Sequence, residues 1–379
     1  MPQVVFVSHH YLLEKRQAGF QFLARTYADL NWEVIFITSP IALFSLFTED
    51  YRFEYPIKKE LNKKINVKNN LVSYIFFTLI SPENINNYSI FKHQPILSKI
   101  INNILTVPYF FYGKKIPKNL KNLIRDSDLV IFESTPALMY FKSFQKVCPN
   151  TRFVYRVSDD LEYLNCHPSV IRYETKIASE FNLISVPSSF FLRKFSNLSN
   201  VRLHHHGLAM NLFEKDYEMP HTFQRFEKNI IFIGNSSLDG NFIKIGATLF
   251  PNWGFHLIGP FQNNWNMGNI MTYGELPFDE TIPYLKFSDI GLQTRTVSKG
   301  FESLSDSLKV IQYTWMKLPI IAPIEMNSTR SHVFYYKQND SSSIGEALVK
   351  AANYDRSKID ISGILSWKEL AQVLANESQ

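Results

Sequence analysis

The sequence predicts an α/β protein built from two doubly wound, Rossmann-like domains that face a central cleft. The chain has 379 residues, which is too long for one ordinary core and suits two. Short β-branched and aromatic runs alternate with helical stretches, as in parallel sheets covered on both faces. This alternation stops once near the middle of the chain and then starts again, so that the pattern itself divides the chain in two.

The N-terminal domain is predicted over residues 1–207 and begins directly with a strand, VVFVS. A helix over residues 16–30 and a second strand, EVIFITS, follow it. The alternation resumes later with four further runs of strand character, at residues 128–134, 152–158, 182–188 and 201–207. Because sheets of this kind bind ligands beyond the carboxyl ends of their strands, polar residues that follow these runs are the first candidates for a site.

The C-terminal domain is predicted over residues 208–362. It opens with a polar segment, residues 210–228, that contains Pro220 and has no clear period, and we interpret this segment as the linker. Five runs of strand character follow, at residues 229–235, 254–259, 269–275, 289–294 and 319–323. Helical stretches accompany them, at residues 239–250, 277–287, 307–317 and 342–353. The tail, residues 363–379, predicts a short amphipathic helix, for which packing back across the seam between the domains is one placement.

The composition favours a globular protein of a reducing compartment. Hydrophobic residues make up 45% and charged residues 20%, and the two cysteines, Cys148 and Cys166, are expected to be free thiols. The N-terminus lacks the basic and apolar regions of a signal peptide. The longest apolar runs, residues 71–80 and 104–113, have about half the length that a membrane span needs, so we predict no transmembrane helix.

An insert in the first domain, residues 52–125, carries an excess of positive charge. It contains 13 Lys or Arg and three acids, whereas the whole chain has a net charge of +6. The insert also holds both aromatic-rich apolar runs. A basic surface interleaved with Phe and Tyr favours binding to an anionic membrane. A solvated basic face and a nucleic-acid site are the alternatives, although no base-stacking module is recognisable by motif.

The segment SLSDSLKVIQYTWMKLPIIAP, residues 303–323, predicts an anion site. Ser307 and the Ser and Asp before it are good N-cap residues for a helix that carries Lys309 in its first turn and Gln312 on the same face. The positive end of a helix together with a lysine ammonium can hold a diphosphate. A lysine in a first turn opposes the helix dipole, which an anionic ligand would explain; an ordinary solvated lysine is the alternative reading.

The same segment resembles the donor-binding helix and strand of GT-B glycosyltransferases. S-x-K-x-x-Q-Y followed by PIIAP is similar to their S-x-K-x-x-E-Y and G-x-P-V-I-A, with Gln312 in place of the usual Glu. The motifs SDLVIFES, RFVYRVSDDLEYL, NLISVPS, HHGL and YGE occur in the same order as in the family of the bacterial membrane-associated glucuronosyltransferase of xanthan assembly. The similarity is clearest over residues 127–207 and 273–323.

The resemblance implies an inverting, metal-independent GT-B enzyme that needs no cofactor. It would transfer a sugar, with glucuronic acid favoured, from a UDP-sugar to a lipid-linked oligosaccharide in exopolysaccharide or capsule assembly. The expected partners are therefore the nucleotide-sugar donor, the lipid-linked acceptor and an anionic membrane, with no nucleic acid. The expected location is cytoplasmic, at the inner face of the membrane.

Asp159 matches the general base of that family. It lies just past the carboxyl end of the strand RFVYRVS, where a carboxylate can accept the proton of an acceptor hydroxyl. Asp160 is adjacent. The alternative reading of Asp159 is a cap for the following helical segment, since Asp is a good N-cap residue.

The resemblance also assigns residues to the donor. Lys309 matches the phosphate-contacting lysine, and Gln312 and Ser307 lie beside it. Glu275 and Leu276 match positions near the uracil and ribose, although the family has Met where Leu276 stands. Gly234 and Asn235 follow the first strand of the second domain, where backbone amides can approach phosphates; a plain turn is at least as good a reading.

The remaining candidates lie in or near the first domain and suit acceptor or carboxylate contacts: His9, Lys15, Arg16, Arg156 and His206. A structural hydrogen bond is the alternative for His9. The run His204, His205 and His206 does not predict a metal site, because neighbours on a strand point to opposite faces and cannot converge on one ion. We therefore expect no metal.

The sequence also bears on three other functions. A dehydrogenase would need G-x-G-x-x-G after the first strand, and SHHYLLEKRQAG does not contain it. A non-catalytic sugar-binding partner in polysaccharide assembly would keep the fold but have no use for Asp159. A GT-B enzyme with another nucleotide-sugar donor stays open as well.

Overall fold

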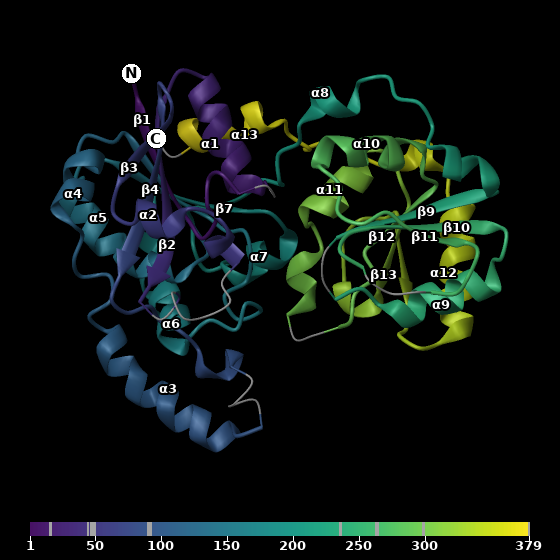
Figure 1. Ribbon diagram of the computed structural model, residues 1–379, viewed down its shortest axis with the longest axis horizontal. Helices are drawn as coiled ribbons and strands as arrows, with labels where there is room; N and C mark the ends of the chain where they lie inside the picture. The colour runs from purple at the N-terminus through teal and green to yellow at the C-terminus, as the bar shows by residue number, and fades with distance from the viewer. Residues whose placement is uncertain are drawn as a thin grey trace. The chain divides into compact units, whose positions relative to one another are not determined.

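The computed structural model describes residues 1–14, 17–43, 45, 51–88, 93–234, 237–261, 265–297 and 300–377. The chain forms two compact units, and Figure 1 shows that each has a central sheet with helices around it. Unit 1 comprises residues 1–204 and 367–379, and unit 2 comprises residues 205–366. The observed boundary therefore lies at His204, where the sequence predicted it near Gly207.

The sheet of unit 1 has eight strands in the order β3-β4-β2-β1-β5-β6-β7-β8. The strands are β1 (Gln3–Ser8), β2 (Glu33–Ala42), β3 (Lys64–Lys68), β4 (Leu71–Thr78), β5 (Leu129–Glu133), β6 (Arg152–Arg156), β7 (Leu183–Val186) and β8 (Val201–Leu203). All neighbours are parallel except β3, which pairs antiparallel with β4 at the edge. Val4 lies opposite Val34 on one side and Leu129 on the other, so β1 is central. The predicted α/β fold class is confirmed.

The strand β4 corrects the sequence interpretation of the insert. Leu71–Thr78 was set apart from the alternating pattern, but it pairs in parallel with β2 over most of its length, and Leu71, Tyr74 and Ile75 are buried. This apolar run is therefore part of the sheet core, although the insert was set apart from the sheet in the sequence interpretation.

Helices of unit 1 are α1 (Gly19–Asp29), α2 (Ile57–Glu60), α3 (Pro95–Tyr109), α4 (Lys118–Ile124), α5 (Phe141–Val147), α6 (Pro168–Ile177), α7 (Ser189–Lys194) and the C-terminal α13 (Trp367–Asn376). The tail helix α13 packs on α1. Trp367 stacks on Phe22 with ring centroids 5.4 Å apart, and the Tyr27 hydroxyl donates to the Ala371 carbonyl at 2.7 Å. Arg152 donates to the Ala375 carbonyl, so the end of the chain is fixed to unit 1.

The sheet of unit 2 has six parallel strands in the order β11-β10-β9-β12-β13-β14. The strands are β9 (Lys228–Ile233), β10 (Trp253–Ile258), β11 (Ile270–Thr272), β12 (Ile290–Leu292), β13 (Ile320–Pro323) and β14 (Val333–Tyr336). The helices are α8 (Met210–Phe213), α9 (Gly240–Leu249), α10 (Phe278–Phe287), α11 (Leu308–Trp315) and α12 (Ser341–Ala352). The sequence reading missed β14 and the short α8, which lies in the segment interpreted as linker.

Each sheet has a point where the strand order reverses. In unit 1 this point lies between β1 and β5, and in unit 2 between β9 and β12. Ligands of open α/β sheets bind beyond the carboxyl ends of the strands at such points. The residues that follow β1, β5 and β6 and those that follow β9 and β12 are therefore the candidates for a ligand site. Within the described ranges, no helix combines the length and the hydrophobicity that crossing a membrane requires.

Candidate functional site

The first cluster of polar residues lies at the carboxyl ends of β1, β5 and β6. Glu133 ends β5, is only 5% exposed, and accepts hydrogen bonds from both neighbouring strands. Its Oε2 accepts from the Ser8 hydroxyl at 2.5 Å and from the His9 amide at 3.0 Å. Its Oε1 accepts from the Ser158 hydroxyl at 2.9 Å. One buried carboxylate therefore ties three strand ends together.

Asp159 lies three residues beyond β6 and is half-buried. Its amide and that of Ser158 both donate to the Ser134 hydroxyl, at 3.3 and 2.9 Å. The next helix, α6, begins only at Pro168 and is capped by His167. The N-cap of α6 is therefore His167 and not Asp159.

Asp160 has a different environment from its neighbour. It is buried and its Oδ1 accepts from the Lys194 ammonium at 2.8 Å. The same ammonium lies 3.1 Å from the buried carboxylate of Glu174. Asp160 is thus held in an internal ion-pair network, whereas Asp159 lies at the half-exposed end of the sheet.

His10 joins this cluster from the loop after β1. Its Nδ1 lies 2.8 Å from Oε1 of Glu14, and its Nε2 lies 3.9 Å from Oε1 of Glu133. Burial lowers the pKa of His10, but the hydrogen bond to Glu14 and the charges of Glu133, Glu14 and Asp159 outweigh it, so the pKa is raised. His10 therefore carries positive charge over a wider pH range than an ordinary histidine.

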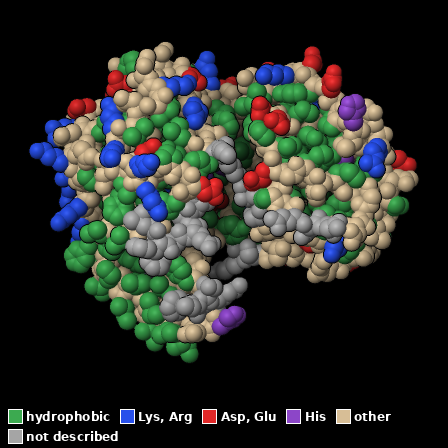
Figure 2. Space-filling model, in the orientation of Figure 1, with side chains coloured by type: hydrophobic (Ala, Val, Ile, Leu, Met, Phe, Trp, Pro, Cys, Tyr) green, Lys and Arg blue, Asp and Glu red, His purple; other side chains and the backbone are tan. Residues whose placement is uncertain are grey.

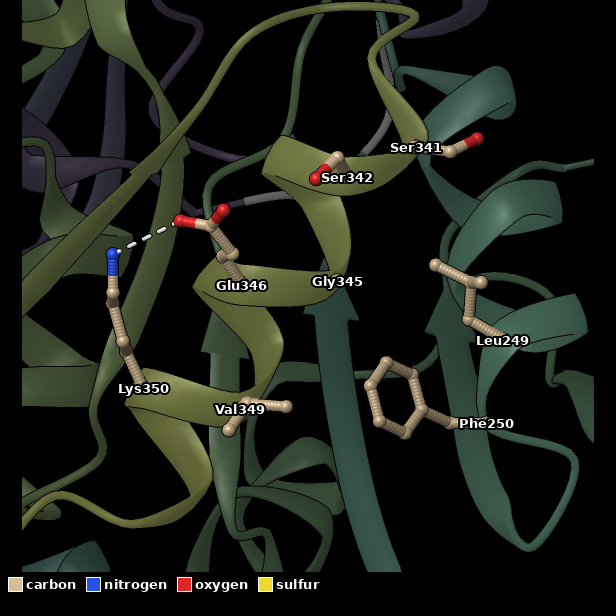
Figure 3. A pocket seen from close by; sticks show the side chains of 8 residues that line it. All are labelled: Leu249, Phe250, Ser341, Ser342, Gly345, Glu346, Val349 and Lys350. Atoms are coloured by element: carbon tan, nitrogen blue, oxygen red, sulfur yellow. Dashed lines mark hydrogen bonds and ion pairs between the residues drawn. The ribbon is translucent and has the colours of Figure 1, made fainter.

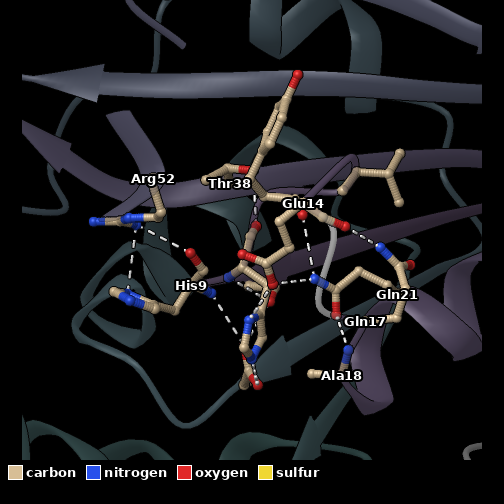
Figure 4. A network of polar contacts seen from close by, with 12 residues as sticks. His9, Glu14, Gln17, Ala18, Gln21, Thr38 and Arg52 are labelled. Atoms are coloured by element: carbon tan, nitrogen blue, oxygen red, sulfur yellow. Dashed lines mark hydrogen bonds and ion pairs between the residues drawn. The ribbon is translucent and has the colours of Figure 1, made fainter. Parts of the chain in front are cut away.

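The loop around His9 is held from two further sides. Arg52 donates to the His9 carbonyl at 3.0 Å and lies 3.5 Å from its ring Nδ1. Gln21 on α1 donates to Glu14 at 2.5 Å, and Figure 4 shows Arg52 and Gln21 approaching the loop from separate elements. His9 is half-buried at the strand end, in the region where the sequence predicted an acceptor contact. The predicted candidates Lys15 and Arg16 lie outside the described residues.

Arg156, another predicted acceptor contact, is only 2% exposed on β6. Its guanidinium donates to the Ser185 hydroxyl at 2.8 Å and to the His204 carbonyl at 2.7 Å. Burial lowers its pKa to about 9. Arg156 therefore cross-links β6, β7 and the end of β8 inside unit 1.

The second cluster lies at the carboxyl ends of β9 and β12, around the start of α11. Ser307 immediately precedes the helix, and its hydroxyl accepts from the Gln293 side chain at 3.2 Å. The Lys309 ammonium lies 3.9 Å from the centre of the Phe232 ring. A Cβ placed on Gly234 would lie 3.1 Å from that ammonium, so Lys309 covers the glycine that follows β9. The structure therefore places Lys309 beside Gly234, with Ser307 at the start of the same helix as Lys309.

Backbone segments approach closely beside this cluster. A Cβ on Gly259 would lie 1.8 Å from the Gly234 carbonyl oxygen, so only glycine fits at this position. The Gly259 amide donates to the Gly274 carbonyl at 2.8 Å. The loops after β9, β10 and β11 thus meet at three glycines, Gly234, Gly259 and Gly274.

Several polar atoms around the start of α11 are buried and unsatisfied. Gln293 Oε1, Thr294 Oγ1 and Ser303 Oγ have no hydrogen-bond partner among the described residues. Buried polar groups are nearly always paired, so such a group of orphaned oxygens is typical of a place that a ligand completes. Sequence reasoning missed Gln293 and Ser303, although Gln293 directly follows the strand β12.

The other predicted donor residues occupy distinct positions. Gln312 is buried on α11, one turn beyond Lys309. Glu275 is exposed and Leu276 is half-buried, both in the loop between β11 and α10. Asn235 lies outside the described residues. Asp306 does not serve as a simple cap, because it pairs with Arg330 at 2.6 Å.

The three consecutive histidines contact different groups. His204 lies 3.1 Å from Glu377, and His205 lies 3.9 Å from Asp306. His206 is half-buried at the start of unit 2. In the described part of the chain, no three His, Cys, Asp or Glu side chains are arranged to hold a metal ion.

A shallow groove of about 450 Å³ lies elsewhere on unit 2, between α9 and α12 (Figure 3). Leu249, Phe250 and Val349 give it an apolar floor, and the Glu346–Lys350 ion pair lies at its side. None of the predicted site residues lines it. We therefore place the candidate site at the strand ends and not in this groove.

Comparisons with known proteins show which proteins this chain is similar to. Residues 6–187 match the model of the N-terminal domain of the glucuronosyltransferase GumK. The chain is 26% identical over 262 residues to the UDP-glucuronate:glycolipid 2-beta-glucuronosyltransferase of Xanthomonas campestris pv. campestris; the match covers 68% of this chain and 64% of that protein.

Solved structures show the same fold at low identity. The UDP-forming α,α-trehalose-phosphate synthase of Burkholderia vietnamiensis aligns with a TM-score of 0.59 at 11% identity, over 100% of this chain and 97% of that one. HepE of Anabaena in complex with UDP aligns with a TM-score of 0.58 at 12% identity, over 100% and 96% of the two chains. Through residues 6–187 the chain is thus related to the glucuronosyltransferase GumK, and its fold is that of the GT-B glycosyltransferases.

Proposed function

We propose that the protein is an inverting glycosyltransferase that moves a sugar from a UDP-sugar, with glucuronic acid favoured, to a lipid-linked oligosaccharide. The observation that carries the proposal is the position of the Lys309 ammonium over Gly234 at the start of α11. A fixed cation at the positive end of a helix suits the diphosphate of a nucleotide sugar. The similarity to a UDP-glucuronate:glycolipid glucuronosyltransferase supports this donor. The same similarity supports a lipid-linked acceptor.

In the proposed reaction, unit 2 holds the leaving group. Lys309 and the first amides of α11 neutralise the diphosphate, and the orphaned oxygens of Gln293 and Ser303 are available to hydroxyls of the donor. As the anomeric bond to the diphosphate breaks, negative charge develops on the departing UDP. A preorganised cation stabilises that charge without reorganisation at the moment of reaction. The proposal therefore assigns to Lys309 the role that a metal has in other transferases.

Unit 1 supplies the base in this proposal. The Asp159 carboxylate accepts the proton of the acceptor hydroxyl while the hydroxyl oxygen attacks the anomeric carbon and UDP departs. Direct displacement inverts that carbon.

Donor binding is the experiment that tests this proposal first. Thermal shift and calorimetry with UDP-glucuronic acid, UDP-glucose, UDP-N-acetylglucosamine and GDP-mannose should show stabilisation by the UDP-sugars, strongest for UDP-glucuronic acid. A ligand that binds only the native state stabilises it by about 2.7 kcal/mol at 100 times its Kd. Stabilisation by GDP-mannose alone would favour a different donor, and no shift with any of them would count against the proposal. A non-catalytic sugar-binding protein would bind the donor but release no UDP.

We further propose that unit 1 binds an anionic membrane through α3 and the chain that follows it. Ile96, Ile100, Ile104 and Val107 form one stripe along α3, and each is at least half exposed. Figure 2 shows a gathering of hydrophobic side chains over this part of unit 1. The exposed lysines of the same stretch are Lys99, Lys114, Lys115, Lys118 and Lys121. Exposed apolar side chains next to basic ones favour an anionic lipid surface.

Replacing the three isoleucines of this stripe with serine is expected to abolish binding to phosphatidylglycerol-containing liposomes. The change removes exposed apolar area, so the melting temperature should stay close to that of the wild type. Co-sedimentation measures binding, and Leu249→Ser with Val349→Ser on unit 2 is the matched control. Unchanged sedimentation of the triple variant would contradict the assignment, as would binding to neutral liposomes that equals binding to anionic ones.

A further inference from the structure

Glu133 is the feature of unit 1 that the proposed chemistry does not yet use. It is a buried carboxylate at the end of a central strand, and burying a carboxylate is costly unless hydrogen bonds compensate it. Three donors do so: the Ser8 hydroxyl, the His9 amide and the Ser158 hydroxyl. Ser8 ends β1, His9 begins the loop after it, and Ser158 immediately precedes Asp159. Glu133 therefore fixes the Asp159 loop against the His10 loop.

The charges around this junction come from four elements. His10 contributes the imidazolium, with Glu14 on the same loop at 2.8 Å and Glu133 on β5 at 3.9 Å. The Asp159 carboxylate, after β6, acts on the same imidazole. Arg52 reaches the carbonyl and ring of His9. Several carboxylates thus surround the single imidazolium of His10. The negative charge of each carboxylate disfavours ionisation of the others.

We propose that Glu133 is a positioning residue for Asp159, and that its negative charge makes the Asp159 carboxylate a stronger base while His10 holds the carboxylates together. This inference rests on the proposed function, since it concerns the base of that reaction. A like charge nearby disfavours ionisation of a carboxylate, and a general base works best when its proton affinity approaches the conditions of the reaction. The hydrogen bonds of Ser158 to Glu133 and of the Ser158 and Asp159 amides to Ser134 fix the position of the Asp159 backbone during the reaction.

Titration of His10 by NMR tests the charge network without any substrate. In the wild type, the imidazole should titrate above the ordinary value of about 6.5. Glu133→Gln and Asp159→Asn each remove one negative charge and should each lower that midpoint by about one pH unit or less. Glu174→Gln is the control, because Glu174 is equally buried but pairs with Lys194 and Tyr155. A His10 midpoint that does not move in either test variant would overturn the proposal.

The pH profile of UDP release from UDP-glucuronic acid, with extracted bacterial lipid-linked oligosaccharide as acceptor, tests the effect on the base. Removing the anion in Glu133→Gln should move the acidic limb to lower pH, and removing the cation in His10→Gln should move it to higher pH. If Glu133 and His10 had only structural roles, both variants would lower the rate, but the acidic limbs of their pH profiles would not shift in opposite directions. If Glu133→Gln does not fold, Ser158→Ala loses one bond to Glu133 and should lower kcat at unchanged KM for the donor. Turnover by Glu133→Gln and His10→Gln with acidic limbs that do not move, or an unchanged kcat of Ser158→Ala, overturns this inference alone. Absence of turnover by the wild type overturns the proposed function as well.

Discussion

An Asp159→Asn variant is expected to lose about 10²–10⁴-fold in turnover while it binds UDP as tightly as the wild type. The amide keeps the shape of the side chain but cannot accept the proton of an acceptor hydroxyl. Asp159 is half-buried and caps no helix, so the change should cost little stability. Release of UDP measures turnover, and calorimetry with UDP measures binding.

The neighbouring Asp160→Asn variant is the matched control. Asp160 is buried and pairs with Lys194, which also holds Glu174. Removing one partner of such a pair leaves a buried charge unpaired, so this variant should melt at a lower temperature yet retain turnover. Full turnover by Asp159→Asn, or loss of turnover by Asp160→Asn alone, would contradict the choice between the two carboxylates.

A Lys309→Ala variant is expected to bind UDP about 10- to 150-fold more weakly, because a hydrogen bond to a charged group contributes about 1.5–3 kcal/mol. The effect should be smaller for uridine, which lacks phosphates. Lys309→Arg should recover part of the affinity, since it restores the charge in a different shape.

Lys350→Ala serves as the control for charge, because Lys350 is exposed on α12 of the same unit and pairs with Glu346. UDP binding by that variant should equal binding by the wild type. Equal loss in both variants would indicate a general effect of net charge. Unchanged affinity of Lys309→Ala would remove the diphosphate site from α11.

The fold was predictable because the strands of both units are continuous apolar runs. VVFVS, LVIFE and NIIFI are buried over most of their length, and such runs are typical of parallel strands covered on both faces. β4 was missed because its apolar run lies among many basic residues, and only pairing with β2 reveals its place. β14 was missed because VFYY is only partly buried and lies at the edge of its sheet.

The candidate site was predictable where residues lie next to each other in the sequence or follow a strand. Ser307 and Lys309 share one helix start, and Gly234 directly follows the first strand of its unit. The junction around Glu133 could not be predicted, because it joins residues 125 positions apart in the chain. The one available signal was an acidic residue at the end of an otherwise apolar run, VIFES. Arg156 lies in a comparable position, yet tertiary contacts turn it into the sheet interior.

A crystal structure of the chain with UDP bound tests the central claim most directly. The proposal predicts diphosphate oxygens within hydrogen-bond distance of the Lys309 ammonium and of the amides that begin α11, with Gly234 against the phosphates. A diphosphate bound at another place, with Lys309 still on the Phe232 ring and away from the nucleotide, would contradict it.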